Sequence, residues 1–180
     1  MTPLSISLPT STANTTVPLI AEGQFAKWQF VSLKEDKNDT GPFLTFTCKL
    51  AAPTVTTDGT PLTPESPVGN VYWHKIYLYE KAEKGSKEPK RGPDGAILIP
   101  ERSLIAVSSF IDALLNTCDA NNANAIAKGK TPRPNFDDAT VQAMTNQFFY
   151  AKMRVKNDEG YGLRNEFGTL LNEADMPKAT

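Results

Sequence analysis

The chain has 180 residues, the length of one ordinary domain. Its 19 basic and 20 acidic residues give a net charge of −1, which excludes a uniformly basic protein held to nucleic acid by bulk charge but allows a local basic face. Two cysteines and one histidine exclude a disulfide-rich scaffold, a zinc finger and a His/Cys metal cluster, and we expect no cofactor.

The sequence predicts neither a membrane segment nor an export signal. No apolar run approaches the roughly 18–20 residues that a membrane span needs, and residues 1–21 lack the basic and apolar regions of a signal peptide. We therefore expect a cytoplasmic protein with free thiols and no membrane partner. Residues 1–21 are rich in Ser, Thr and Pro, which predicts an extended N-terminal arm. Leu4, Ile6 and Leu8 alternate in it, so the arm could add an edge strand to a second copy.

A β-hairpin is predicted over residues 23–51. Its first strand, 23–33, is rich in aromatic residues but has mixed parity, because Phe25 and Leu33 share one face and Trp28 the other. A bulge or bend would let the inward face change along this strand. Residues 34–42 supply turn residues, and 43–51 then alternates cleanly. The apolar face of that second strand consists of Leu44, Phe46, Cys48 and Leu50.

A third strand is predicted over 71–80, between two long loops at 52–70 and 81–95. One face carries Tyr72, His74, Ile76 and Leu78, and the other carries Val71, Trp73, Lys75, Tyr77 and Tyr79. The period then changes to 3.6, which predicts an amphipathic helix over 101–118. Its apolar stripe consists of Leu104, Val107, Phe110, Ile111, Leu114 and Leu115.

The last third of the chain predicts a loop, a short helix and a second hairpin. The loop is 119–135, and Asp137 or Asp138 can cap a helix near 138–146. Strands follow at 148–156 and 161–170. The expected core comprises Leu44, Phe46, Leu50, Ile76, Leu78, Phe149, Met153 and Val155.

This element order is that of an OB-fold, a five-stranded antiparallel barrel, here with a helix between strands 3 and 4 and long loops. A general α+β sandwich is the main alternative fold. We place the single domain at 22–172, with a C-terminal tail at 173–180.

No enzyme is predicted. The chain has no glycine-rich phosphate loop and no G-x-S-x-G turn. His74 lies within a strand, Cys48 is on an apolar face, and the carboxylates fall in turns and loops. These positions favour packing and solvation over general acid–base or nucleophilic chemistry.

A binding surface is better supported, because outward strand positions combine aromatic and basic side chains. Aromatic rings can stack unpaired bases while Lys and Arg meet phosphates. The candidate nucleic-acid-binding residues are Trp28, Lys49, Trp73, Lys75, Tyr77, Tyr150, Lys152, Arg154 and Arg164. The alternative is that these aromatic residues are strand formers covered by the helix or by a partner protein.

Three segments resemble a family of small bacteriophage single-stranded-DNA-binding proteins with an OB-fold. They are EGQFAKWQFVSLKEDKNDTGPFLTFTCKL, IPERSLIAVSSFIDALL and FFYAKMRVKNDEGYGLRNEFGTLL, which match its opening hairpin, middle helix and closing hairpin in order. The resemblance implies a protein that coats single-stranded DNA, largely independently of sequence, during phage replication or recombination in the host cytoplasm. It also implies contacts with other replication or recombination proteins.

A second hypothesis is a structural or assembly protein, of a virion or another complex. It would dock through the arm at 1–21 and the aromatic sheet face, and could form a homo-oligomer through the arm. The two hypotheses differ in their partner, which is single-stranded DNA in the first and protein in the second.

Overall fold

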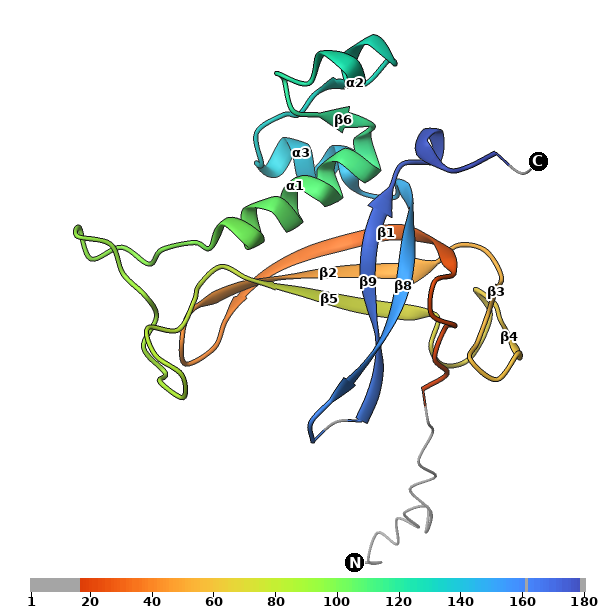
Figure 1. The fold of residues 1–180 in the computed structure, drawn as a ribbon, viewed down its shortest axis with the longest axis horizontal. Helices are drawn as coiled ribbons and strands as arrows, with labels where there is room; N and C mark the ends of the chain where they lie inside the picture. The colour runs from red at the N-terminus through yellow and green to blue at the C-terminus, as the bar shows by residue number, and fades with distance from the viewer. Residues whose placement is uncertain (1–16, 161, 179–180) are drawn as a thin grey trace, which may run out of the picture.

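Five long strands and one long helix organise the computed structural model, which describes residues 17–160 and 162–178 (Figure 1). The strands are β1 (Phe25–Lys37), β2 (Pro42–Leu50), β5 (Val71–Tyr77), β8 (Phe148–Asp158) and β9 (Gly162–Leu171), and the helix is α1 (Glu101–Leu115). The shorter elements are β3 (Thr54–Val55), β4 (Pro61–Leu62), β6 (Thr117–Cys118), α2 (Ala123–Ala127), β7 (Thr131–Pro132), α3 (Asp138–Met144) and the 3-10 turn η1 (Glu173–Asp175).

The long strands form a single antiparallel sheet in the order β5–β2–β1–β8–β9. This confirms the predicted fold class, a mostly-β, OB-like fold in which the helix separates the third and fourth long strands. β5 and β9 are the two edges, and within the described part of the chain no ladder joins them. We call the gap between these edges the seam.

No helix in the described ranges is long and apolar enough to cross a membrane.

The predicted change of parity in β1 is confirmed by a register shift between Phe30 and Ser32. Before the shift Trp28 and Phe30 point inward and are at most 1% exposed. β1 pairs with β8 through Phe25–Gln29 and continues along β2 as far as Lys37. β1 therefore extends four residues beyond its predicted end at residue 33. The charged residues 34–37, which were expected to form a turn, pair with β2 instead.

The core lies between the concave face of the sheet and α1. Of the predicted core residues, Leu44, Phe46, Leu50, Ile76, Phe149 and Met153 are buried, whereas Leu78 and Val155 are half-buried. Phe110 of α1 stacks on Phe46 with 4.3 Å between ring centroids. Stacked and edge-to-face ring pairs of this kind add to the stabilisation from buried area.

The helix differs from its prediction at both ends. Leu104 was expected in the apolar stripe but is 53% exposed, because the neighbouring Ser103 turns inward instead and donates from Oγ to the carbonyl of Tyr77 at 2.6 Å. The helix ends at Leu115 rather than 118, since Asn116 adopts a left-handed φ of 54° at the C-cap. Thr117 and Cys118 then pair with β7.

The predicted loops contain some regular structure. Residues 52–70 hold the β3–β4 hairpin, and 119–135 hold α2 and β7. The short helix near 138 is confirmed as α3, with Asp137 accepting from the backbone N–H of Thr140 at 2.8 Å.

The folded domain begins before residue 22, because Ile20 is 2% exposed and pairs with Thr56. The segment around Ile20 is attached to β9 by Asn165. The Asn165 side chain accepts from the Ile20 N–H at 2.7 Å and donates to the Ile20 carbonyl at 2.9 Å. The Asn165 carbonyl in turn accepts from the Tyr72 hydroxyl at 3.0 Å. One residue thus joins the N-terminal segment, β9 and β5 across one end of the seam.

We expect Asn165→Ala to lower the free energy of unfolding by roughly 1–3 kcal/mol, because it leaves two part-buried main-chain groups of Ile20 without partners. Asn157→Ala is the matched control, since Asn157 is exposed on the same hairpin. Urea denaturation of both variants measures the effect. Equal midpoints for the two variants would show that the Asn165 bonds contribute nothing.

Candidate nucleic-acid interface

The outer surface of β2 and β5 brings aromatic and basic side chains together. Tyr72, His74 and Ile76 of β5 point inward, so the alternate residues of that strand point outward. Trp73 is 62% exposed and Tyr77 45%. The ladder places Trp73 opposite Thr47, Lys75 opposite Thr45 and Tyr77 opposite Phe43. We call this surface the β2–β5 face; it consists of Phe43, Thr45, Thr47 and Lys49 with Trp73, Lys75 and Tyr77.

Contacts within the β2–β5 face fix its aromatic rings close to a cation. The Lys75 ammonium lies 5.1 Å from the centroid of the Phe43 ring, and the Phe43 and Tyr77 centroids are 5.7 Å apart. Lys49 is exposed at the other end of β2, opposite Val71. The face therefore offers flat ring surfaces with ammonium groups beside them, which suits a stacked, negatively charged ligand.

Phe43 in this face and Lys34 beside it on β1 are not among the candidate residues. Phe43 alternates outward with Thr45, as the strand pattern predicts, but it is not among the residues expected to bind. Lys34 was assigned to a turn, but the β1 bulge brings it onto the ladder opposite Thr45, so Lys34, Thr45 and Lys75 form one row across three strands. Lys34 bonds Asp36 at 2.9 Å, and this bond lowers the pKa of the Asp36 carboxyl.

Tyr79, which the alternation placed on the outer face, is only 8% exposed. β5 ends at Tyr77 and the chain then turns. The Tyr79 ring packs over Gly41, where a Cβ atom would lie 2.7 Å from it, and its hydroxyl accepts from the Asn38 amide at 2.7 Å. Tyr79 therefore supports the β1–β2 turn.

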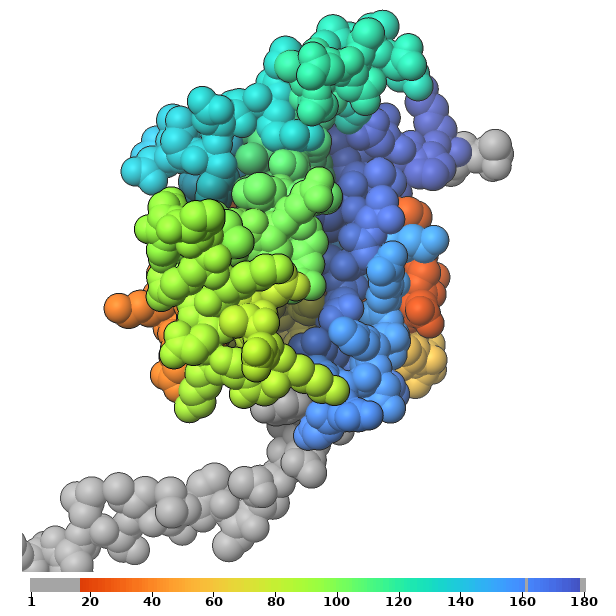
Figure 2. Space-filling view, turned by 60° about the vertical axis from the view of Figure 1, so that its left-hand side comes forward, coloured from red at the N-terminus to blue at the C-terminus, as the bar shows by residue number. Residues whose placement is uncertain are grey.

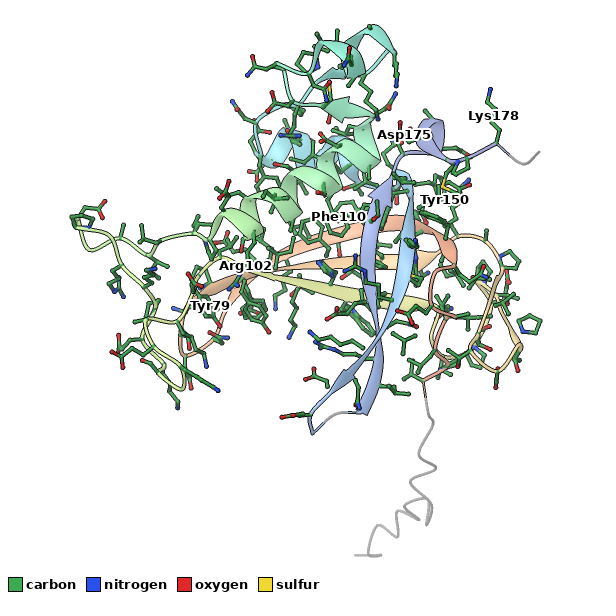
Figure 3. All side chains as sticks on the ribbon, in the orientation of Figure 1. Tyr79, Arg102, Phe110, Tyr150, Asp175 and Lys178 are labelled. Atoms are coloured by element: carbon green, nitrogen blue, oxygen red, sulfur yellow. The ribbon has the colours of Figure 1, made fainter. Side chains whose placement is uncertain are left out.

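Tyr150 and Lys152 lie on the outer surface of β8, separated from β5 by β2 and β1. The structure does not bring them into the β2–β5 face. They belong to a second cluster, in which the Lys27 ammonium lies 5.3 Å from the Phe148 centroid and 5.6 Å from that of Tyr150. In Figure 3, Tyr150 is labelled beside the upper ends of β8 and β9. This cluster presents a smaller aromatic surface, since Phe148 is 42% exposed and Tyr150 is half-buried.

The candidate cations of the β8–β9 hairpin are partly neutralised. Arg164 lies 3.0 Å from an Asp158 carboxylate oxygen and 3.2 Å from one of Glu166. Arg154 pairs opposite Glu166 in the ladder, and its side chain lies over Gly168, where a Cβ atom would be 2.9 Å from Nε. Arg154 forms no ion pair with the residues described. Arg164 is consequently a weaker candidate for phosphate contact than Arg154, Lys49 or Lys75.

The prediction that Trp28 stacks bases is wrong, because this side chain is 1% exposed in the core. Its ring centroid lies 5.4 Å from Phe167 and 6.0 Å from Tyr72. Trp28 precedes the β1 bulge and therefore keeps the inward parity of Phe30. Its indole N–H has no hydrogen-bond partner in the described chain.

Two further titratable side chains face inward: Cys48 is buried and His74 is half-buried. Burial raises the pKa of the Cys48 thiol to about 12, so the inward-facing thiol stays protonated. Burial lowers the pKa of His74, which faces the seam rather than the β2–β5 face. Among the residues that the structure covers, no group of three His, Cys, Asp or Glu side chains could hold a metal ion.

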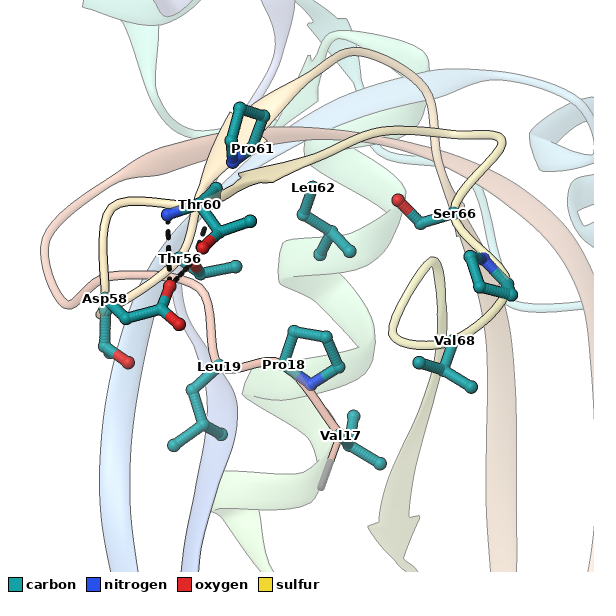
Figure 4. Close-up of a pocket in the computed structure, with 12 residues that line it drawn as sticks. Val17, Pro18, Leu19, Thr56, Asp58, Thr60, Pro61, Leu62, Ser66 and Val68 are labelled. Carbon is teal, nitrogen blue, oxygen red and sulfur yellow. Dashed lines mark hydrogen bonds between the residues drawn. The ribbon is translucent and has the colours of Figure 1, made fainter. Parts of the chain in front are cut away.

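A hollow of about 430 Å³ lies between Val17–Leu19 and the β3–β4 hairpin (Figure 4). Its walls are mainly apolar and include Pro18, Leu62 and Val68. The Asp58 carboxylate accepts from the Thr56 hydroxyl and the Thr60 N–H, and these bonds lower its pKa. The polar groups of this hollow thus satisfy one another within a turn, so we assign it no binding role.

No protein-family model matches the chain, and a search of curated proteins finds no significant match. The resemblance to phage single-stranded-DNA-binding proteins therefore remains an expectation from three sequence segments. Any function has to be inferred from the geometry of the β2–β5 face.

Proposed function

We propose that this protein is a non-enzymatic, largely sequence-independent binder of single-stranded DNA that acts in phage DNA replication or recombination. The β2–β5 face carries the proposal, because it combines exposed Trp73 and Tyr77 with Lys75 on one strand. Base stacking on aromatic side chains contributes roughly 1–3 kcal/mol per base and tolerates any base, since every base has a π-face. Flexible lysines add phosphate contacts that carry no sequence information.

The position of this face in the fold also supports the proposal. OB-folds that bind oligonucleotides use the surface of their second and third strands together with the loops after strands 1 and 4. In this chain the second and third long strands are β2 and β5. The corresponding loops are the β1–β2 turn and the connection between β8 and β9; the end of β8 next to it projects beyond the other strands in Figure 1. A strand of DNA on the β2–β5 face would pass between these two loops.

Binding to a labelled thirty-nucleotide thymine oligomer, followed by fluorescence anisotropy, should weaken as salt rises. Each phosphate neutralised on a single strand contributes about −0.7 to the log–log slope. Contacts from Lys49 and Lys75 therefore predict a slope of about −1.4. Lys34 would bring it to roughly −2 if a phosphate displaces Asp36 from it. A duplex of the same length should bind much more weakly, because its bases cannot stack on the face. Salt-independent binding, or equal affinity for the duplex, would contradict the proposal.

Trp73→Ala and Tyr77→Ala should each weaken binding about 5- to 150-fold, the range expected for loss of one stacked base. Phe136→Ala is the matched control. Phe136 is also an aromatic residue, 41% exposed, but it lies just before α3 and outside the β2–β5 face. All three variants should unfold at the wild-type temperature. Unchanged affinity in a folded Trp73→Ala, Tyr77→Ala double variant would remove this face from the interface.

The cations should contribute unequally. We expect Lys75→Ala to weaken binding severalfold, whereas Arg164→Ala should have a smaller effect because Asp158 and Glu166 already neutralise the guanidinium. Anisotropy titrations at one low salt concentration compare the two variants. A larger loss from Arg164→Ala would move the phosphate path onto the β8–β9 hairpin.

The assembly-protein hypothesis is favoured by a different observation. Four aliphatic side chains on and just before α1 are 44–58% exposed, and such a patch can mark a protein interface. They are Leu98, Ile99, Leu104 and Ile105.

Deletion of residues 1–16 tests whether the arm mediates assembly, as the second hypothesis requires. These residues lie outside the described part of the chain, and the deletion retains Ile20. If the arm mediates assembly, size-exclusion chromatography should show a multimer that becomes a monomer on deletion. An unchanged elution size for the folded variant would argue against assembly through the arm.

A further inference from the structure

The seam contains a groove bounded by β5, α1 and β9. Two hollows of about 320 Å³ each meet at His74 and Ala106. Arg102 lies at the start of α1 and Phe110 further along the helix, beside β9 (Figure 3). Figure 2 shows the α1 surface between the 78–100 loop and β9. The first hollow is completed by Lys75, Ile76, Tyr77 and Ser103, and the second by Ser109, Phe110, Phe167, Gly168, Thr169 and Leu170.

One wall of the groove is an unpaired strand edge. The Leu78 N–H bonds Pro42 and the Asn70 carbonyl bonds Leu50, so the even-numbered residues of β5 direct their main-chain groups to β2. The odd-numbered residues therefore direct theirs to the seam, as the Ser103 bond to the Tyr77 carbonyl illustrates. No described residue pairs with the main-chain groups of Trp73 or Lys75 on that side. The edge thus offers both donors and acceptors.

The floor of the groove is aromatic and includes the single histidine of the chain. The His74 ring centroid lies 5.4 Å from that of Phe110 and 5.6 Å from that of Phe167. The ring nitrogens of His74 have no hydrogen-bond partner among residues 17–160 and 162–178. Burial lowers the pKa of His74, so at neutral pH the imidazole presents one donor and one acceptor.

The rim of the groove is basic. The Arg102 side chain is 74% exposed, and its nearest carboxylate, that of Glu80, is 3.9 Å away. Lys75 also lines this hollow, but its ammonium lies over the Phe43 ring on the β2–β5 face, so Arg102 is the cation that faces the groove. Exposed pairs at such a distance are weak, so the guanidinium can exchange Glu80 for a phosphate at little cost.

We propose that the groove binds one nucleobase of the DNA strand that crosses the β2–β5 face, with the phosphate of that nucleotide at Arg102. This inference rests on the proposed function. A flat ring with hydrogen-bonding edges matches aromatic walls, a free imidazole and an unpaired strand edge, and the rim supplies the countercharge. A volume of about 320 Å³ is at the lower end of small-molecule sites, roughly 300–1,000 Å³, which suits a single nucleotide. Because β5 borders both surfaces, a strand stacked on Trp73 and Tyr77 reaches the groove by passing over the β5 edge.

Proton NMR of the full-length protein tests the inference directly, since one imidazole Hε1 signal reports on the groove. The indole N–H of Trp73 reports on the β2–β5 face, and that of buried Trp28 is an internal control. Titration with a ten-nucleotide thymine oligomer should shift the His74 and Trp73 signals. An abasic oligomer of the same length, which keeps the phosphates but lacks bases, should leave His74 unshifted.

The outcomes separate this inference from the proposed function. A shift of Trp73 without His74 would overturn base binding in the groove and leave DNA binding on the β2–β5 face intact. No shift of either signal would overturn both. A His74 shift with the abasic oligomer equal to that with thymine would also overturn the inference, because it would show no recognition of a base. A parallel titration with an apolar peptide completes the test. If the peptide shifts His74 and the oligomers do not, the inference is overturned, because the groove would then bind protein.

A groove-filling variant provides an independent readout. Ala106→Leu places extra methyl groups where the two hollows meet and should abolish the His74 shift, weaken oligomer binding about fivefold or more, and preserve the Trp73 shift. Ala127→Leu is the matched control, because Ala127 is exposed on α2. Wild-type affinity together with a wild-type His74 shift in folded Ala106→Leu would overturn the inference.

Discussion

The register shift between Phe30 and Ser32 is the constraint on which the arrangement of the sheet depends. β1 is the central strand, and it pairs with β8 through its first five residues and with β2 along most of its length. A bulge bends a strand and increases its twist. The sheet can therefore curl around the core, which turns the outer surfaces of β5 and β8 in different directions. The β2–β5 face and the Lys27–Tyr150 cluster are separate surfaces because β1 lies between β2 and β8.

The alternation of side chains along the strands divides the aromatic residues into two groups. Rings such as Trp28, Phe46 and Phe110 stabilise the core, while Phe43, Trp73 and Tyr77 remain available to a ligand. The unpartnered indole N–H of Trp28 carries a desolvation penalty of roughly 1–3 kcal/mol. Burial of a large aromatic side chain offsets this penalty, so a tryptophan can remain in a core that gives its nitrogen no acceptor.

Alternation within single strands was enough to predict the strands, most of the core and the exposure of Trp73, Lys75 and Tyr77. It did not predict the surroundings of side chains that depend on how one strand pairs with another. The side of the bulge on which Trp28 falls follows from pairing with another strand, and so does the contact of Arg164 with the Asp158 carboxylate on β8. The seam groove could not be predicted at all, since His74, Ala106 and Phe167 are far apart in sequence and meet only when α1 packs between the two sheet edges.

The bonds between Ile20 and Asn165 span 145 positions of the chain. During synthesis on the ribosome, the segment that contains Ile20 emerges well before β9 and must wait for it. Loops of this length are slow to close, because their entropic cost precedes the contacts that repay it. The domain is therefore expected to complete its fold only once β9 has left the ribosome, with the apolar surface of its first hairpin open to chaperones until then.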